Sequence, residues 1–257
     1  MNLSKKKLND LTILNELKNS CYIGDDVRAS WIGDYDTNTD VTEFKNYAKW
    51  SLQHWNMYYG FFSHIKQNKI NYILDAACGT GYNTNMLSKY LPESIIFGVD
   101  LDKESIILAN KYNSTKNICY KIDDLLSSTF EVKFDYIYFV EILEHIKEYN
   151  HYIMIDKLLS LLQDDGYLFI TTPNELDNKD SEYGHIGFLN RERTQNFIKR
   201  YENNIVLSQF YDNKRLETDN CIIDEPINTY QNTSSGVGGI QGAPNKSHFK
   251  IILKNYI

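Results

Sequence analysis

The chain has 257 residues, of which 24% are charged and 42% hydrophobic, and its formal net charge is −7. Its 13 glycines and 4 prolines exclude collagen-like or proline- and glycine-rich disordered chains. The acidic balance disfavours a protein that coats nucleic acid or anionic lipid. No apolar run approaches the length of about 18 residues that a transmembrane helix needs, and residues 1–20 lack the apolar stretch of a secretory signal. We therefore expect a cytoplasmic protein without a membrane span.

The first part of the chain is predicted to be helical. Residues 1–20 have leucines at three-residue steps, and residues 41–65 predict one long helix or two short ones, rich in Trp, Tyr and Phe. These aromatic side chains either cover the edge of a core or line a substrate pocket.

From residue 71 onward, apolar strand patterns alternate with helical patterns. This alternation predicts an α/β fold whose sheet is covered by helices on both faces. Residues 212–246 are polar and predict a long loop, which in a compact domain is usually a lid, a binding loop or disorder. Strands are predicted at 71–78, 94–100, 117–126 (with a turn), 134–141, 167–173, 204–211 and 248–253, and helices at 84–91, 103–112, 142–146, 151–162 and 191–201.

The strongest motif is DAACGTG, which begins at Asp75 where the first of these strands turns into a helix. Small residues at Ala77, Gly79 and Gly81 permit positive φ angles and let a ligand approach the backbone closely. A dinucleotide fingerprint would need a third glycine at the position of Thr84, and Asp75 would repel a pyrophosphate. A ligand with a cationic amino-acid end suits this acidic residue better.

DAACGTG resembles the D-x-G-x-G-x-G motif of the class I S-adenosylmethionine (SAM)-dependent methyltransferases, with Ala77 in place of the first glycine. The resemblance implies a doubly wound, mostly parallel seven-stranded sheet in which the strand at 248–253 is antiparallel. It also divides the chain into a helical N-terminal cap, residues 1–69, and a SAM-binding domain, residues 70–257, with 212–246 as its lid or substrate loop.

The same resemblance implies the residues that bind SAM. An acidic residue at the end of the second strand would accept hydrogen bonds from both ribose hydroxyls, and its neighbour would pack on the adenine. One of two carboxylates after the third strand would accept from the adenine amino group, and the end of the fourth strand would lie beside the methionine portion. The implied cofactor-binding residues are Asp75, Ala77, Gly79, Gly81, Asp100, Leu101, Asp123, Asp124 and Val140.

A second motif, E-x-x-E-H, follows the fourth strand as Glu141, Glu144 and His145. If a helix starts there, these three side chains share one face. His145 and Glu141 are the candidate catalytic residues, with His145 as a general base for an acceptor hydroxyl. Alternatively, the three bind a divalent metal with His185, a set that suits Mg²⁺, Mn²⁺, Fe²⁺ or Zn²⁺, or His145 has a structural role.

The four-residue set resembles that of the metal-dependent small-RNA 2′-O-methyltransferases and the ubiquinone-biosynthesis O-methyltransferases. We therefore expect a SAM-dependent O-methyltransferase that acts on a hydroxyl or phosphate-type oxygen of a small polar metabolite, with or without a metal. The alternatives are an RNA 2′-O-methyltransferase, which the acidic charge disfavours, and a non-catalytic SAM-binding protein. No motif specifies the oligomeric state, and His151 and His248 are predicted to be ordinary surface or strand residues.

Overall fold

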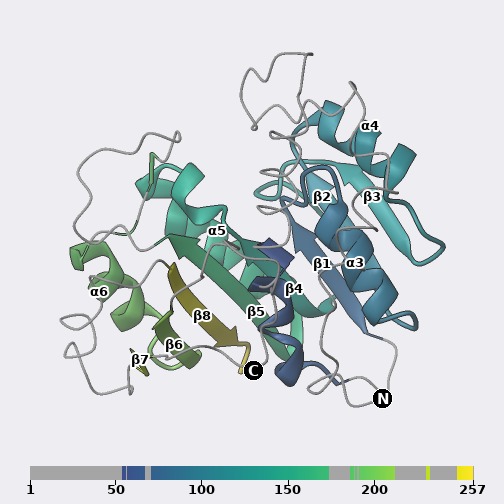
Figure 1. Cartoon of the computed structure of the whole chain (residues 1–257). Coiled ribbons are helices and arrows are strands. Elements are labelled where there is room, and N and C mark those ends of the chain that lie inside the picture. Colours follow the sequence, from purple (N-terminus) through teal and green to yellow (C-terminus); the bar gives the residue numbers. More distant parts are fainter. Residues whose placement is uncertain are drawn as a thin grey trace, which may run out of the picture. The chain divides into compact units, whose positions relative to one another are not determined.

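The chain divides into two compact units, which are described separately: Met1–Asp124 with Lys214–Glu225, and Leu125–Asn213 with Pro226–Ile257. Several sequence-based predictions concern residues that the structure does not describe: those for residues 1–53, 212–229 and 232–247, and for His185. Within the described ranges, no helix is both long enough and apolar enough to cross a membrane. The computed structural model (Figure 1) describes residues 54–55, 57–66, 71–173, 186–187, 189, 191–211, 230–231 and 248–256.

The first unit contains a parallel three-stranded sheet in the order β3-β2-β1. Helices α3 and α4 connect its successive strands and pack against them (Figure 1). Helix α4 begins at a capping residue, Asp102, whose side chain accepts a 2.9 Å hydrogen bond from the Ser105 N–H. The elements are β1 (Tyr72–Ala76), α3 (Tyr82–Tyr90), β2 (Ile95–Asp100), α4 (Lys103–Tyr112) and β3 (Ile118–Ile122), preceded by the short 3-10 helix η2 (Phe62–His64).

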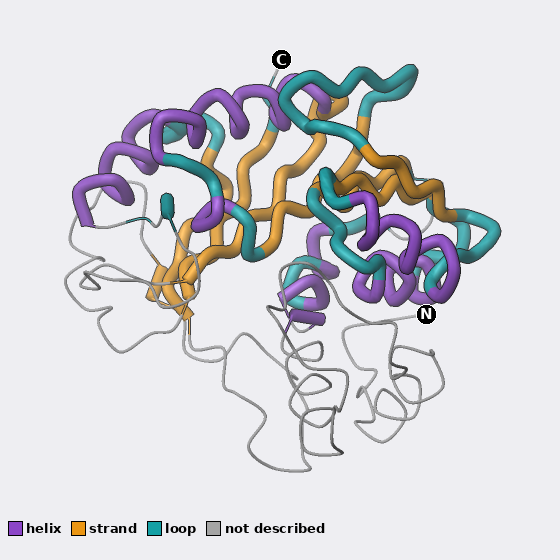
Figure 2. Tube along the Cα trace, turned by 90° about the horizontal axis from the view of Figure 1, so that it is seen from above, coloured by secondary structure: helices purple, strands orange, loops and turns teal. Residues whose placement is uncertain are grey.

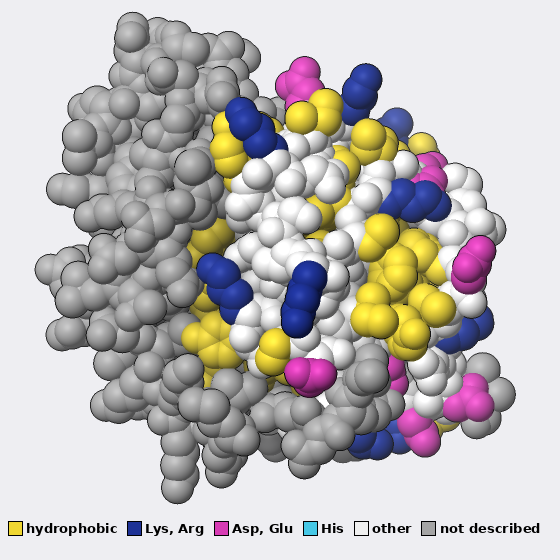
Figure 3. All heavy atoms as spheres, turned by 90° about the vertical axis from the view of Figure 1, so that its right-hand side faces the viewer, with side chains coloured by type: hydrophobic (Ala, Val, Ile, Leu, Met, Phe, Trp, Pro, Cys, Tyr) yellow, Lys and Arg dark blue, Asp and Glu magenta, His cyan; other side chains and the backbone are white. Residues whose placement is uncertain are grey.

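Strand β3 forms the outer edge of this unit's three strands, and several of its side chains are exposed. The exposed large hydrophobic side chains include Ile107 of α4 and Ile122 of β3. Figure 3 shows this side of the molecule, where hydrophobic side chains gather in a patch and the Lys and Arg side chains in view are dispersed. The described part of this face therefore presents no continuous basic track.

The second unit contains strands in the order β4-β5-β8-β6-β7. Strand β4 runs parallel to β5, and all seven of its residues are buried, which explains its uninterrupted apolar sequence. Strand β8 is antiparallel to both β5 and β6, as the resemblance to class I methyltransferases implied for residues 248–253. The elements are β4 (Phe134–Val140), η3 (Leu143–His145), α5 (Glu148–Leu161), β5 (Leu162–Pro173), α6 (Arg191–Arg200), β6 (Ile205–Tyr211), β7 (Tyr230–Gln231) and β8 (His248–Lys254).

The predicted fold class is confirmed. Seven strands of at least five residues are described, with the two-residue β7 in addition. Within each unit the helices pack beside the strands and not between them (Figure 2). One boundary differs from the prediction: β5 begins at Leu162 and includes the Asp164-Asp165-Gly166 sequence expected to end a helix. Asp165 has a φ of 63°, and the pairing with β4 shifts register there, so this turn-like sequence forms an irregularity inside a strand.

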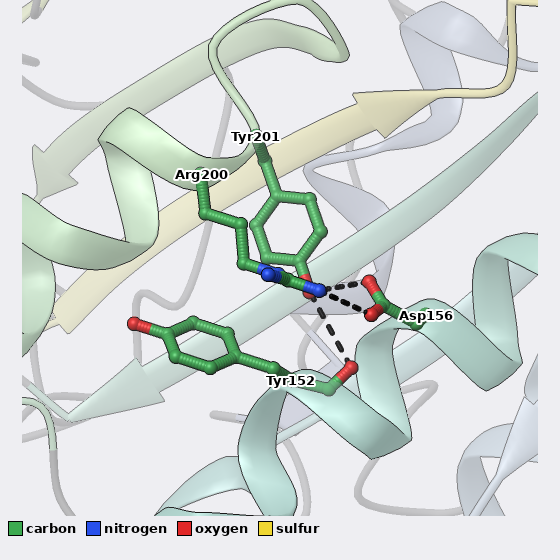
Figure 4. A network of polar contacts seen from close by, with 4 residues as sticks. All are labelled: Tyr152, Asp156, Arg200 and Tyr201. Carbon is green, nitrogen blue, oxygen red and sulfur yellow. Dashed lines mark hydrogen bonds and ion pairs between the residues drawn. The ribbon is translucent and has the colours of Figure 1, made fainter.

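A polar cluster joins α5 to the end of α6 (Figure 4). The Asp156 carboxylate of α5 accepts a 2.8 Å hydrogen bond from the Tyr201 hydroxyl and pairs with the Arg200 guanidinium at 2.6 Å. That guanidinium also lies over the Tyr152 ring, 4.9 Å from its centre. The cluster holds the C-terminal end of α6 against α5, shortly before β6 begins.

Candidate functional site

The turn after β1 has the backbone that its small residues permit. Ala77, Gly79 and Gly81 have φ angles of 63°, 55° and 76°, all in the left-handed region. The Cys78 N–H donates to the Val99 carbonyl at 3.0 Å, which ties the turn to β2. Gly81 directly precedes α3, so the turn leads into the N-terminus of a helix, as in many anion- and nucleotide-binding loops.

Two side chains that the sequence analysis did not single out support this turn. The Tyr120 hydroxyl donates to the Gly81 carbonyl at 3.0 Å, and the Asn113 side-chain amide donates to the Thr80 carbonyl at 2.8 Å. A Cβ atom on Gly81 or Gly98 would collide with the Tyr120 ring. A side chain at position 81 would be strained by the left-handed φ angle and would collide with the Tyr120 ring, so glycine suits this position.

Asp100, at the end of β2, lies against the same turn. One of its carboxylate oxygens accepts the Gly79 N–H at 2.8 Å, and the other accepts the Asp102 N–H at 2.9 Å. Burial raises the pKa of Asp100, and these two hydrogen bonds partly offset the rise. Each carboxylate oxygen retains acceptor capacity, so a carboxylate fixed in this position can accept hydroxyl groups from a ligand.

Asp75, at the end of β1, is completely buried. Its Oδ1 accepts a 2.6 Å hydrogen bond from the Tyr58 hydroxyl, and its Oδ2 accepts a 2.5 Å hydrogen bond from Thr84. Burial raises the pKa of Asp75 to about 6, although both hydroxyl donors act to lower it. The expected affinity of Asp75 for a cationic ligand group stays a prediction, because its contacts here are both intramolecular.

The described aromatic residues before β1 pack on the end of α3. The Trp55, Tyr59 and Phe62 rings lie 5.2, 6.3 and 5.9 Å from the Tyr90 ring. Trp55 and Phe62 are buried, so these residues cover the edge of the first unit's core. That is one of the two roles expected for them, and the cap predicted from residues 1–69 stays a prediction because most of it lies outside the described residues.

The other implied cofactor residues occupy the ends of their strands. The Asp123 N–H donates to the Asp100 carbonyl at 3.1 Å, so the ends of β3 and β2 are adjacent. The Asp123 carboxylate accepts the Asp124 N–H at 2.9 Å and pairs with Lys121 at 2.5 Å. Leu101, next to Asp100, is 71% exposed, and Val140 is buried at the end of β4.

The second motif does not form the helix face that the sequence analysis expected. Glu141 leaves β4 with a φ of 57°, in the left-handed region, and Ile142 is also non-helical. Only the 3-10 helix η3 follows, and α5 begins at Glu148. The expected i, i+3, i+4 arrangement of Glu141, Glu144 and His145 is therefore wrong, because the backbone turns before any α-helix starts.

The three side chains instead have separate surroundings. Glu141 accepts a 2.8 Å hydrogen bond from Thr171, and its other oxygen lies 3.2 Å from Nε2 of His248. Glu144 is 1% exposed and accepts a 3.0 Å hydrogen bond from Thr172. His145 is exposed. His248, predicted to be an ordinary residue, thus contacts a candidate catalytic carboxylate.

These contacts do not fit the predicted metal site. Among the described residues, no three His, Cys, Asp or Glu side chains are grouped so that they could hold a metal ion. Glu141 and Glu144 are bound by consecutive residues of β5, while His145 is exposed. The metal prediction for Glu141, Glu144 and His145 is therefore not supported, and the fourth predicted ligand, His185, lies outside the described residues.

Residues 56–216 match the model of a family described as a methyltransferase domain. The ubiquinone biosynthesis O-methyltransferase of Glaesserella parasuis is 32% identical over 110 residues, which are 40% of this chain and 45% of that protein. A malonyl-[acyl-carrier protein] O-methyltransferase of Bacillus cereus is 37% identical over 65 residues, 25% of this chain and 24% of that protein. The chain thus matches less than half the length of either curated relative.

Solved structures show the same fold at low sequence identity. The plantazolicin methyltransferase BpumL, in complex with SAH, is similar with a TM-score of 0.56 and 16% identity, over 95% of this chain and 99% of that one. The N-methyltransferase NodS from Bradyrhizobium japonicum gives a TM-score of 0.51 and 14% identity, over 85% of this chain and 100% of that one. These likenesses support the α/β fold with its antiparallel β8.

Proposed function

This chain belongs to the methyltransferase-domain family, and from that premise we propose that it is a SAM-dependent O-methyltransferase that acts on a small polar metabolite. The methyl group would pass from the sulfonium of SAM to a hydroxyl or phosphate-type oxygen. The names of the two curated relatives, both O-methyltransferases, support oxygen as the acceptor atom.

The observation that carries the SAM part of this proposal is the contact between Asp100 and the glycine turn. A carboxylate held by the Gly79 N–H is fixed beside a turn whose backbone a ligand can approach closely. Asp100 would accept the ribose hydroxyls, and the exposed Leu101 would pack on the adenine. Asp123 or Asp124 would then accept from the adenine amino group, since β3 ends beside β2.

The acceptor part rests on the polar side chains at the carboxyl end of β4 and β5. Parallel α/β sheets bind their ligands at this edge. A hydroxyl acceptor must lose its proton during methyl transfer, and a nearby carboxylate or imidazole can accept it. Glu141 and His145 both follow β4, and the exposed His145 stays a predicted base.

Turnover of SAM carrying a ¹³C-methyl group tests the proposal. The protein would be incubated with 3,4-dihydroxybenzoate, 3-hydroxybutyrate, glycerol 3-phosphate and, as a nitrogen acceptor, tyramine. We expect S-adenosylhomocysteine release and a new ¹³C methoxy signal with at least one hydroxy compound. Methylation of the amine nitrogen alone would contradict oxygen as the acceptor atom, and an absence of SAM binding would contradict the whole proposal.

A further inference from the structure

The two carboxylates of the E-x-x-E-H motif are bound by consecutive residues of one strand. Thr171 of β5 donates to Glu141, and Thr172 donates to Glu144. Successive side chains of a β-strand point to opposite faces of the sheet. The two carboxylates are therefore held on opposite faces of the second unit's sheet, and a single metal ion cannot bind both in this arrangement.

The register of β8 agrees with this division. Pro173 pairs with His248, and Thr171 pairs with Lys250, so these four residues share one face. His248 accordingly contacts Glu141, the carboxylate bound by Thr171. Thr172 pairs with Phe249 on the other face, where Glu144 lies.

Glu144 has the surroundings of a structural residue. Besides its buried carboxylate, its backbone carbonyl accepts the N–H groups of Ile186 and Gly187, each at 2.9 Å. A Cβ atom on Gly187 would collide with the Ile146 carbonyl, so two backbone segments approach closely here. Glu144 therefore holds η3 and residues 186–187 together.

Glu141 and His248 are less deeply buried than Glu144: each of their side chains is 10% exposed, whereas Glu144 is 1% exposed. Their face also carries Lys250, whose burial lowers its pKa to about 8. A carboxylate, an imidazole and an amine thus share the face at the end of β4 and β5, where parallel sheets present their ligand sites.

We propose that the E-x-x-E-H motif of this chain is not a metal site, and that Glu141 and His248 instead form the acceptor site, where they take the proton of the acceptor hydroxyl. This inference rests on the proposed O-methyltransferase function. The acceptor oxygen forms a bond to the methyl carbon while the carbon–sulfur bond breaks, and the sulfonium becomes a neutral thioether. The hydroxyl proton passes to the Glu141–His248 pair, so no ion is needed to acidify the hydroxyl.

The metal part is tested by calorimetric titration of the full chain with Mn²⁺, compared with Glu141→Gln and Glu144→Gln variants. We expect no saturable Mn²⁺ binding up to about 1 mM, the weak end of the range of carboxylate cation sites. One-site Mn²⁺ binding that is lost in both variants would overturn the inference. This measurement needs no acceptor, so its outcome is independent of the proposed function.

The His248 part is tested with His248→Gln, using the hydroxy compound that the protein methylates. We expect kcat to fall about 100-fold while the Kd for SAM changes less than twofold. Lys254→Gln is the matched control, because Lys254 lies on the same strand but pairs with Asp165 at its other end. Its kcat should stay within twofold of the wild type.

A kcat of His248→Gln within twofold of the wild type would overturn the inference. If that variant does not fold, Thr171→Val removes only the hydroxyl that holds Glu141, and should lower kcat at least tenfold; an unchanged kcat would again contradict us. A wild-type protein that binds SAM but methylates no hydroxy compound contradicts the proposed function, and the Mn²⁺ titration then decides the metal question separately.

Discussion

The Tyr58 hydroxyl donates a 2.6 Å hydrogen bond to the buried Asp75 carboxylate, and so joins the aromatic segment before β1 to the start of the glycine turn. Thr84 of α3 binds the other carboxylate oxygen. Three elements of the first unit therefore meet at one carboxylate. Because a buried charge is costly unless hydrogen-bonded, both hydroxyls stabilise the turn that Asp75 begins.

The raised pKa of Asp75 predicts a specific pH dependence of stability. Its folded-state pKa of about 6 exceeds the ordinary value of 3.8, so between these values the folded chain binds a proton that the unfolded chain has lost. The contribution of Asp75 to the unfolding free energy therefore falls as pH rises from about 4 to 6. The fall is at most ~3 kcal/mol, because the two pKa values differ by about two.

Asp75→Asn removes that titration. The unfolding free energy of Asp75→Asn minus that of the wild type should increase by ~1–3 kcal/mol as the pH is raised from 4.5 to 7.5, as measured by urea denaturation. Glu104→Gln, which changes an exposed carboxylate of α4, is the control and should show a difference below ~0.5 kcal/mol. An Asp75→Asn difference that is constant with pH would contradict the account.

Ala77 has a backbone that favours glycine, with a φ of 63°. Ala77→Gly should raise the unfolding free energy by ~0.5–1 kcal/mol, because relief of left-handed strain exceeds the added entropy of the unfolded chain. The matched control is Ala76→Gly in β1, where no such strain exists and stability should fall. Equal losses in both variants would show that Ala77 is not strained.

The sequence was sufficient to predict the elements that position the cofactor site. Strong local patterns specify β1, β2 and their helices, and the small residues at 77, 79 and 81 do adopt left-handed backbones. Tyr58 and Tyr120 were missed, because a single tyrosine that supports a distant turn leaves no periodic or spacing signal.

Prediction failed where helical spacing was assumed. Glu141 and Glu144 would share a face only in an α-helix. Glu141 has a left-handed backbone conformation, so no α-helix begins there. His248 was missed because its contact depends on antiparallel pairing of β8 with β5, a long-range relationship. One signal was available: an antiparallel strand beside β5 must begin where β5 ends, which places its first residue at the ligand edge.

The cluster between α5 and α6 contains a partly buried hydrogen bond and a half-exposed ion pair (Figure 4). Tyr201→Phe removes a hydroxyl that is partly buried against Asp156 and should lower the unfolding free energy by ~1–2 kcal/mol. Arg200→Gln breaks an ion pair whose side chains are about half exposed, and should cost less than ~1 kcal/mol. Thermal unfolding measures both, and a larger loss for Arg200→Gln would reverse this assignment.

The most direct test of the cofactor site is calorimetric titration of the full chain with SAM, compared between Asp100→Asn and Asp102→Asn. The wild type should bind one SAM per chain, and Asp100→Asn should weaken the Kd at least ~10-fold through loss of a charged acceptor for the ribose. Asp102→Asn should leave the Kd within about twofold, because asparagine still caps α4. Binding of NAD without SAM, or equal SAM affinity in the wild type and Asp100→Asn, would contradict the account.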